Sequence, residues 1–217
     1  FETVRLKLAA DESVFLGNVA DDGSWTLDFN RAVDYLRNAA EKAEPVLLLG
    51  TAFSFIHLLD YLVEKNLRFA LPVGSRAMET GGYKGRSRAL PKSELHALIT
   101  DRLGIAASEI ICEYGMSELS SQAYDAPPSS EVGNPKTELR TLHFPPWARV
   151  QIVSPETGRE VGEGETGLVR IFDLANVFSV MAVQTEDLAI RRGDRFGLIG
   201  RAEQSEPRGC SLMPGTA

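Results

Sequence analysis

A short run of hydroxyl, carboxylate and aromatic residues, Glu113-Tyr114-Gly115-Met116-Ser117-Glu118, is the first candidate for chemistry in this sequence. It follows the apolar residues Ile110-Ile111-Cys112, which predict a short buried strand, so Ser117 and Glu118 are expected at that strand's carboxyl end. A hydroxyl there can donate to a phosphate oxygen, and a carboxylate can hold a Mg²⁺ ion that bridges phosphates. Ser117 and Glu118 are therefore candidate catalytic residues for displacement at a nucleotide α-phosphate, with Glu118 as the metal ligand.

The aromatic residue of this run, Tyr114, offers a flat apolar face suited to packing beside a nucleotide base. The alternative for the run is an ordinary strand-to-helix turn, in which Ser117 and Glu118 stabilise free N–H groups at a helix N-terminus. Taken alone, the run favours this alternative.

A glycine-rich run, Thr80-Gly81-Gly82-Tyr83-Lys84-Gly85, is the second candidate. Paired glycines adopt positive φ and let the backbone come close to a ligand. The run follows a predicted strand, Arg68 to Val73, that would neighbour the strand before Tyr114. The loop Gly81-Gly82-Tyr83 is therefore a candidate wall of a base pocket, although glycines also simply form turns.

Three further residues are candidates with equally ordinary alternatives. Asp187 can accept hydrogen bonds from both ribose hydroxyls, or it can cap a hairpin that leads to Arg191-Arg192-Gly193-Asp194. Arg201 can meet phosphate or ribose oxygens with its forked donors, or lie on the surface. Cys210, beside Arg208, can accept an acyl group as a thiolate, or be an inert cysteine.

The elements that must position these residues alternate between helix and strand in the first part of the chain. They are a helix from Leu27 to about Lys42, a strand Val46 to Leu49, a helix Ala52 to Lys65, a strand Arg68 to Val73, a helix Lys92 to Leu103 and a strand Ile110 to Cys112. Strands separated by such helices form parallel βαβ units with right-handed crossovers, and these sheets bind ligands at the carboxyl ends of their strands.

The chain changes character after a polar, proline-rich stretch at 126–136. Short strand-like runs at 147–153, 167–172 and 179–184 follow it, punctuated by glycine and proline. We therefore predict an α/β fold with three parts: an α/β nucleotide-binding segment over residues 1–135, a β-rich subdomain over 136–199, and a hinge or C-terminal segment over 200–217.

Composition excludes several classes of protein. A net charge of −7 argues against nonspecific nucleic-acid binding, which needs a basic face. No apolar run approaches the roughly 20 residues that span a bilayer, and the two cysteines, Cys112 and Cys210, cannot form a disulfide framework. We expect a soluble, cytoplasmic protein that binds neither nucleic acid nor membrane, with Cys112 in the core. The three histidines show no metal-ligand spacing.

The order of the motifs resembles the nucleotide-site signature of the adenylate-forming superfamily and, more narrowly, the acyl-protein synthetase family. That family includes the fatty-acid ligase of the bacterial bioluminescence reductase complex. The resemblance runs from about residue 40 to the C-terminus. It rests on these runs: Thr80 to Gly85, Glu113 to Glu118, Gly164-Glu165-Thr166-Gly167, Thr185-Glu186-Asp187-Leu188, Gly200-Arg201 and Ser205 to Leu212.

The resemblance implies the large domain of an adenylate-forming enzyme that uses ATP and Mg²⁺. Ser117 would touch the AMP phosphate and Glu118 would bind Mg²⁺. The region of Gly81, Gly82 and Tyr114 would hold adenine, with Tyr83, Gly115 and Met116 as further nucleotide-binding residues. Asp187 would bind the ribose and Arg201 the ribose or phosphate, with Cys210 as the acyl-accepting thiol. A carboxylic acid, expected to be a fatty acid, would become acyl-AMP and then pass to a thiol.

The sequence departs from the family pattern at the phosphate loop, in the segment after Arg201 and at Ser117. The chain lacks the Ser/Thr/Gly-rich phosphate loop, the hinge carboxylate and the catalytic lysine of the mobile C-terminal domain, and it has serine where threonine is frequent before the metal-binding glutamate. We therefore expect an incomplete fragment that is inactive alone.

The acyl acceptor stays open among Cys210, a partner reductase or thioesterase, coenzyme A and a carrier protein. Alternative functions are a phenylacetate-type acyl- or aryl-CoA ligase and a noncatalytic nucleotide- or acyl-binding module.

Overall fold

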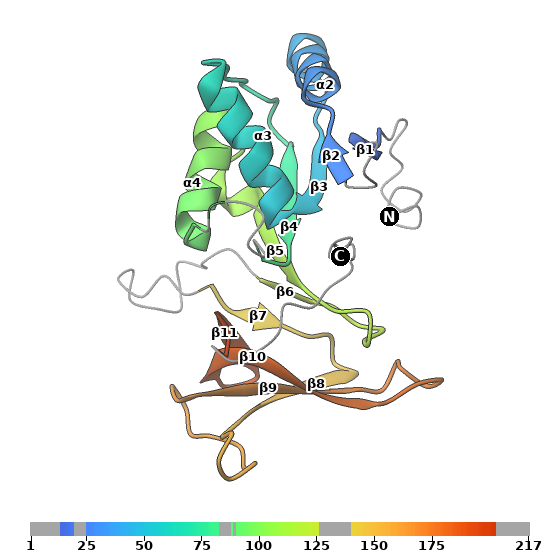
Figure 1. Cartoon of the computed structure of the whole chain (residues 1–217), viewed down its shortest axis with the longest axis vertical. Helices are drawn as coiled ribbons and strands as arrows, with labels where there is room; N and C mark the ends of the chain where they lie inside the picture. The colour runs from blue at the N-terminus through green and yellow to red at the C-terminus, as the bar shows by residue number, and fades with distance from the viewer. Residues whose placement is uncertain (1–13, 20–24, 83–87, 89, 126–139, 203–217) are drawn as a thin grey trace, which may run out of the picture.

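One nine-stranded sheet runs through the protein, as seen in a computed structural model that describes residues 14–19, 25–82, 88, 90–125 and 140–202 (Figure 1). Its strand order is β3-β4-β5-β6-β7-β11-β10-β9-β8. The strands are β3 Leu47–Thr51, β4 Arg76–Thr80, β5 Ile110–Tyr114, β6 Ala123–Asp125, β7 Leu142–His143, β8 Ala148–Val153, β9 Thr166–Asp173, β10 Ala182–Arg192 and β11 Arg195–Arg201. A separate antiparallel pair is formed by β1 Gly17–Val19 and β2 Trp25–Leu27.

The first part of the sheet is parallel, as predicted, and carries the helices (Figure 1). The helices are α2 Phe29–Lys42, α3 Ala52–Glu64 and α4 Lys92–Leu103. Their apolar faces form one core with β4 and β5, and its fully buried members include Ile56, Leu59, Leu62, Leu95, Ile99, Leu103 and Ile110. The predicted helices and the strands at Val46 and Ile110 are confirmed to within one or two residues at most ends.

Local capping explains where these helices begin and end. The Asp28 carboxylate accepts a hydrogen bond from the Arg31 amide at 3.0 Å, so α2 begins at Phe29, two residues after the predicted Leu27. The Thr51 hydroxyl caps α3 in the same way through the Ser54 amide. At the end of α4, Gly104 has φ +72, and an added Cβ would lie 3.2 Å from Ala70 Cα. Glycine at this position therefore both ends the helix and admits a neighbouring chain segment.

The predicted strand from Arg68 to Val73 is wrong. This segment has no strand pairing; Phe69 and Leu71 instead donate backbone hydrogen bonds to the carbonyls of Arg102 and Leu103 at the end of α4. Leu71 is buried there, so the apolar pattern reflects packing against a helix end. The strand of this region is β4, which begins after the turn at Val73 and Gly74. As a result, Gly81 follows its strand directly.

The second part of the sheet is antiparallel and β-rich, as predicted. The runs at 147–153 and 167–172 form β8 and β9, whereas the run at 179–184 only overlaps β10, which continues to Arg192. Strands β6 and β7 join the two parts into one sheet. The predicted boundary at 135/136 lies outside the described residues. Within those residues, no helix has the length and apolar character needed to cross a membrane.

Candidate nucleotide site

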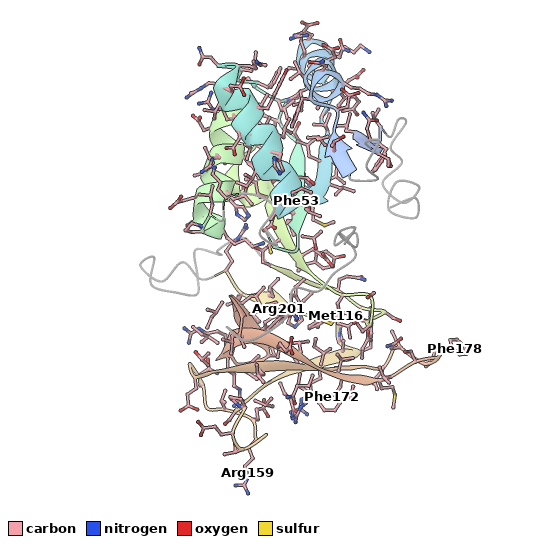
Figure 2. All side chains as sticks on the ribbon, in the orientation of Figure 1. Phe53, Met116, Arg159, Phe172, Phe178 and Arg201 are labelled. Atoms are coloured by element: carbon pink, nitrogen blue, oxygen red, sulfur yellow. The ribbon has the colours of Figure 1, made fainter. Side chains whose placement is uncertain are left out.

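Three of the predicted site residues meet where the two parts of the sheet join. The Tyr114 hydroxyl, at the end of β5, donates a hydrogen bond of 2.7 Å to Asp187 Oδ2 on β10. Arg201, at the end of β11, places its Nε 3.5 Å from Asp187 Oδ1 and is directly paired with Asp187 in the sheet. Figure 2 shows Arg201 and Met116 at the level between the helical and the β-rich parts. The fold therefore brings together residues from three separate motifs.

Tyr114 is a core residue as well as a hydrogen-bond donor. Its ring is 8% exposed and contacts Phe144 and Phe196 edge to face, with centroid separations of 6.4 and 5.5 Å. Burial, and then the charge of Asp187, raise the pKa of Tyr114 far above its usual value, so the phenol stays protonated and donates. The ring face expected to pack against a base is covered in this arrangement, and the contact that Tyr114 offers is its hydroxyl on Asp187.

Asp187 lies inside β10, beside an irregularity in the pairing of that strand. The alternative of an aspartate capping a hairpin is wrong, because the turn between β10 and β11 falls at Gly193 and Asp194 instead. The Asp187 carboxylate keeps 21% of its side-chain surface exposed. Arg201 also lies 3.2 Å from Glu186 Oε2, so its guanidinium bridges two carboxylates at the edge of the site.

Ser117 and Glu118 occupy a turn between two antiparallel strands, β5 and β6. The Leu119 amide donates to the Met116 carbonyl at 3.1 Å, which closes the turn around the two residues. No helix follows, so the alternative of a strand-to-helix turn is wrong. Both side chains are exposed, and the Ser117 hydroxyl donates to Glu118 Oε2 at 3.2 Å. A hydroxyl and a carboxylate are thus presented together to solvent.

The residues around this turn are less exposed. Met116 packs against the aromatic core, and an added Cβ at Gly115 would lie 3.1 Å from Gln122 Cγ. The turn is therefore attached to the core on one side, with glycine where space is short.

Gly81 and Gly82 form the loop at the end of the neighbouring strand, as predicted. Strand β4 pairs in parallel with β5, with Thr80 opposite Glu113, so Gly81 lies beside Tyr114 at the same edge of the sheet. Gly81 has φ +70, and an added Cβ at either glycine would meet nothing within 4 Å. Open space next to exposed backbone is what close approach to a ligand requires.

A buried ion pair behind this loop was not found from the sequence. Glu79 is fully buried on β4, and Lys92 Nζ on α4 lies 2.6 Å from Glu79 Oε2 and 3.5 Å from the Gly81 carbonyl oxygen. His96 Nε2 lies 3.4 Å from Glu79 Oε1. Burial alone would raise the pKa of Glu79, but the His96 hydrogen bond and the Lys92 charge lower it below its usual value. The pair therefore ties the glycine loop to α4; Glu79 and Lys92 are 13 residues apart, and no local motif links them.

Of the two cysteines, the structure describes Cys112. Cys112 is buried, as predicted, and burial, together with the charge of Glu79, raises the pKa of its thiol to about 12, so it is unreactive at neutral pH. Cys210 and Tyr83 lie outside the described residues.

Mg²⁺ fits the site through its substrate rather than through a protein cage. Among the residues that the structure describes, no group of three or more His, Cys, Asp or Glu side chains is placed to hold a metal ion. Mg²⁺ with nucleotides usually binds one or two carboxylates together with the phosphates, and the exposed Glu118 carboxylate beside the Ser117 hydroxyl meets this need.

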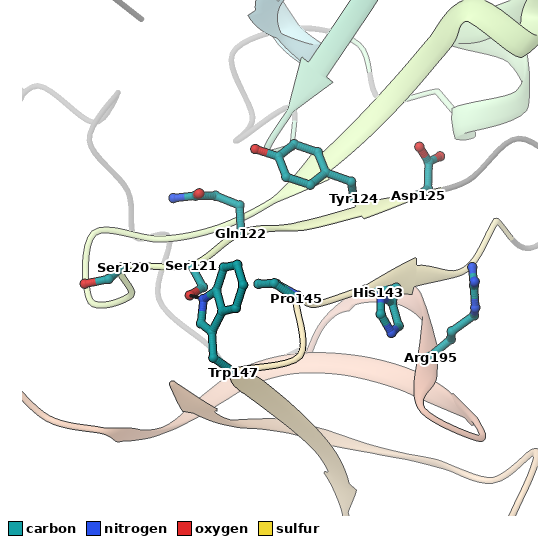
Figure 3. A pocket seen from close by; sticks show the side chains of 9 residues that line it. All are labelled: Ser120, Ser121, Gln122, Tyr124, Asp125, His143, Pro145, Trp147 and Arg195. Atoms are coloured by element: carbon teal, nitrogen blue, oxygen red, sulfur yellow. Dashed lines mark hydrogen bonds between the residues drawn. The ribbon is translucent and has the colours of Figure 1, made fainter. Parts of the chain in front are cut away.

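A groove of about 470 Å³ is lined by the chain that follows the Ser117–Glu118 turn, by β6, β7 and the segment after β7, and by Arg195 of β11 (Figure 3). Tyr124 on β6 is directly opposite His143 on β7, and Trp147 forms the other end. The Trp147 indole N–H donates to the Ser121 hydroxyl at 3.0 Å, so the ring is held in place although it is 54% exposed. The groove thus adds fixed aromatic surface beside the turn.

Comparisons with known proteins agree on one family and one fold. The family model for the acyl-protein synthetase, LuxE, matches residues 3–215. A "Long-chain-fatty-acid--luciferin-component ligase" of Aliivibrio fischeri is 22% identical over 197 residues, which are 86% of this chain and 49% of that protein. The chain therefore spans about half the length of the curated relatives it matches.

Solved structures share the fold at low sequence identity. The structure of McyG A-PCP complexed with phenylalanyl-adenylate has a TM-score of 0.56 at 18% identity, covering 81% of this chain and 29% of that one. ATP-bound MatB from Rhodopseudomonas palustris has a TM-score of 0.55 at 16% identity, covering 81% and 33%. The predicted fold class, a parallel α/β segment joined to a β-rich part, is confirmed, and this fold is shared with structures of adenylate-forming enzymes.

Proposed function

The chain belongs to the acyl-protein synthetase, LuxE, family, and on this premise we propose that it supplies the nucleotide site of an enzyme that activates a carboxylic acid with ATP. The acid is a fatty acid, and the acyl group then passes to a thiol. The observation that carries the proposal is the meeting of Tyr114, Asp187 and Arg201, which lie far apart in the sequence but share one corner of the fold.

In this proposal Asp187 accepts hydrogen bonds from the ribose hydroxyls. Its carboxylate is partly exposed, and the Tyr114 hydroxyl and Arg201 hold it in place from two sides. The Gly81-Gly82 backbone, at the same edge of the sheet, lines the adenine. Arg201 contributes to ribose or phosphate binding through its forked guanidinium donors.

Ser117 and Glu118 face the phosphates. The Ser117 hydroxyl donates to the α-phosphate, and Glu118 holds Mg²⁺, which neutralises phosphate charge when it is bound. A carboxylate oxygen of the acid attacks the α-phosphorus, and the bond to the pyrophosphate oxygen breaks, giving acyl-AMP and pyrophosphate. A thiolate then attacks the acyl carbon and AMP leaves with the electron pair of the broken bond.

The acceptor thiol is Cys210 in the leading form of the proposal, because the family resemblance gives it that role and the other cysteine, Cys112, is buried. Coenzyme A, a carrier protein and a partner reductase or thioesterase are the alternative acceptors. The name of the Aliivibrio fischeri relative specifies a long-chain fatty acid, which favours a fatty over an aromatic acid here. We place the enzyme in the cytoplasm.

Acid-dependent exchange of labelled pyrophosphate into ATP tests the proposal. The gene product that contains this chain is assayed beside the chain itself, with short, long and aromatic carboxylic acids. Exchange that requires a long-chain acid supports the proposed reaction. Nucleotide binding without exchange for any acid favours the second candidate, a noncatalytic nucleotide-binding module.

A further inference from the structure

Asp173, at the end of β9, is fully buried and accepts four hydrogen bonds. The donors are the Ser120 amide at 3.0 Å, the Ser121 amide at 2.8 Å, the Ser121 hydroxyl at 2.8 Å and the Ala175 amide at 3.0 Å. Burial alone would raise the pKa of Asp173, but these hydrogen bonds, led by the Ser121 hydroxyl, lower it below its usual value. Asp173 is therefore an ionised carboxylate, and all its hydrogen-bond partners are donors.

Asn176, in the turn after β9, holds the same stretch of chain. Its Nδ2 donates to the Glu118 carbonyl oxygen at 2.8 Å and to the Val180 carbonyl oxygen at 2.8 Å. Its Oδ1 accepts a hydrogen bond from the Ser120 hydroxyl at 3.1 Å. All its polar atoms are used, although the side chain is in a turn.

These contacts hold the main chain of Glu118, which lies in the turn with Ser117, and of Ser120 and Ser121, which follow the turn. On its other side the turn is fixed by β5, which ends at Tyr114 in the aromatic core. The exposed Ser117 and Glu118 side chains therefore stand on backbone that is anchored at both ends. Precise function of such side chains depends on supporting contacts of this kind.

We propose that Asp173 and Asn176 are positioning residues of the nucleotide site. They fix the main chain at Glu118, so that the Ser117 hydroxyl and the Glu118 carboxylate keep the orientation that phosphate and Mg²⁺ binding require. Neither residue touches the nucleotide. This inference rests on the proposed function of the Ser117–Glu118 turn.

The chemistry of the site explains why a carboxylate is used at position 173. All four groups that point at Asp173 are donors, and an ionised carboxylate is a pure acceptor. In Asp173→Asn one acceptor oxygen becomes an NH₂ group, which faces one or more of the same donors in either orientation. Where the NH₂ group replaces Oδ2, the Ser120 and Ser121 amides lose their acceptor. Where it replaces Oδ1, the Ala175 amide loses its acceptor and the Ser121 hydroxyl can no longer donate to residue 173. Either loss weakens the contacts that hold the chain after the turn.

The first readout needs no nucleotide and no activity. Hydrogen exchange of the Ser120 and Ser121 amides is measured in the metal-free gene product, in wild type, Asp173→Asn and Asn176→Ala. Wild type is expected to protect both amides, and Asp173→Asn to reduce the protection of both. The matched control is Asp125→Asn. It alters another buried carboxylate, which accepts a hydrogen bond of 2.6 Å from the Cys112 backbone amide. This control should leave Ser120 and Ser121 protected.

The second readout is the Mg²⁺ dependence of pyrophosphate exchange. Asp173→Asn and Asn176→Ala should raise the Mg²⁺ concentration for half-maximal exchange by on the order of tenfold, because the loss of a supporting contact typically lowers metal affinity or activity 10- to 100-fold. The KM for the acid should stay unchanged. Asp125→Asn should lower thermal stability without this shift. Should Asp173→Asn fail to fold, Asn176→Ala and Ser121→Ala decide the matter by the same two readouts.

The outcomes separate this inference from the proposed function. Wild-type exchange with unaltered Mg²⁺ dependence in the variants, despite released amides, overturns the positioning role and leaves the proposed function standing. Absence of exchange in wild type overturns the proposed function and the inference together. Released amides with a raised Mg²⁺ requirement support the positioning role.

Discussion

The hydroxyl of Tyr114 donates a 2.7 Å hydrogen bond to the carboxylate of Asp187, which lies 73 residues further along the chain. The bond joins the last residue of a strand in the parallel part of the sheet to the middle of a strand in the antiparallel part. It therefore fixes the proposed ribose contact relative to the glycine loop, which borders Tyr114 on the other side.

Loss of this hydrogen bond should weaken nucleotide binding. Tyr114→Phe keeps the ring in the core and removes only the donor to Asp187. A hydrogen bond to a charged group contributes about 1.5–3 kcal/mol, and water can replace part of it because Asp187 is partly exposed, so AMP affinity should fall by roughly tenfold. Calorimetric titration of AMP measures this. Tyr35→Phe, on a tyrosine of α2 away from the site, is the control, and equal AMP affinity in Tyr114→Phe and wild type would contradict the role.

Glu118 should control the metal dependence of the reaction. Glu118→Gln keeps the size of the side chain but removes the charge that we assign to Mg²⁺ binding, so acid-dependent pyrophosphate exchange should fall by about 100-fold or more. Glu156→Gln, which neutralises another exposed glutamate, should not change the exchange rate. The assignment fails if the two variants exchange at similar rates at all Mg²⁺ concentrations.

The two glycines of the loop should respond differently to alanine. Gly81 has φ +70, a conformation that costs an alanine about 1 kcal/mol, whereas Gly82 has no positive φ and has the same open space around it. Chemical denaturation should therefore show a loss of stability in Gly81→Ala and little change in Gly82→Ala. Both should bind AMP less tightly if the backbone here lines the adenine, and tight AMP binding by both would remove the loop from the site.

The buried pair of Glu79 and Lys92 predicts a pH-dependent stability difference. Lys92→Met leaves the Glu79 carboxylate buried without its cation, which should cost about 2 kcal/mol at neutral pH, at the low end because the Lys92 side chain is 36% exposed. The pKa of Glu79 is lowered in the folded protein, so its contribution is present above its ordinary value of 4.5 and is lost on acidification. The difference between wild type and Lys92→Met, measured by urea unfolding, should shrink toward about pH 4.

A difference that stays constant or grows on acidification would show that Lys92 stabilises the fold by packing alone. The double variant Glu79→Gln/Lys92→Met serves as the control, because it removes the buried charge and should recover part of the lost stability at neutral pH.

Sequence patterns predicted the elements with strong local signals. The helix Lys92–Leu103 was predicted to the residue because Pro91 and Gly104 mark its ends, and the Glu113–Glu118 run was placed correctly at the end of a buried strand. The run from Arg68 to Val73 misled because its apolar residues pack against the end of α4, and packing on a helix leaves the same pattern as packing in a sheet.

The contacts that support the site could not be read from local patterns. Asp173 bonds to Ser120 and Ser121, and Asn176 bonds to Glu118, in each case across more than fifty residues. Lys92 likewise reaches Glu79 from a different element. Burial of Tyr114 was missed for the same reason, since Phe144 and Phe196 are distant in sequence. Such pairings follow from the strand order of the sheet, which local patterns in a single sequence do not reveal.

The account depends most directly on Asp187 as the residue that recognises ribose hydroxyls beside Tyr114 and Arg201. The measurement is the affinity of the gene product for AMP and for 2′,3′-dideoxy-AMP, in wild type and in Asp187→Asn. Wild type should prefer AMP by about tenfold or more, and Asp187→Asn should lose most of that preference while binding the dideoxy nucleotide as wild type does. An undiminished preference for AMP in Asp187→Asn would contradict the account.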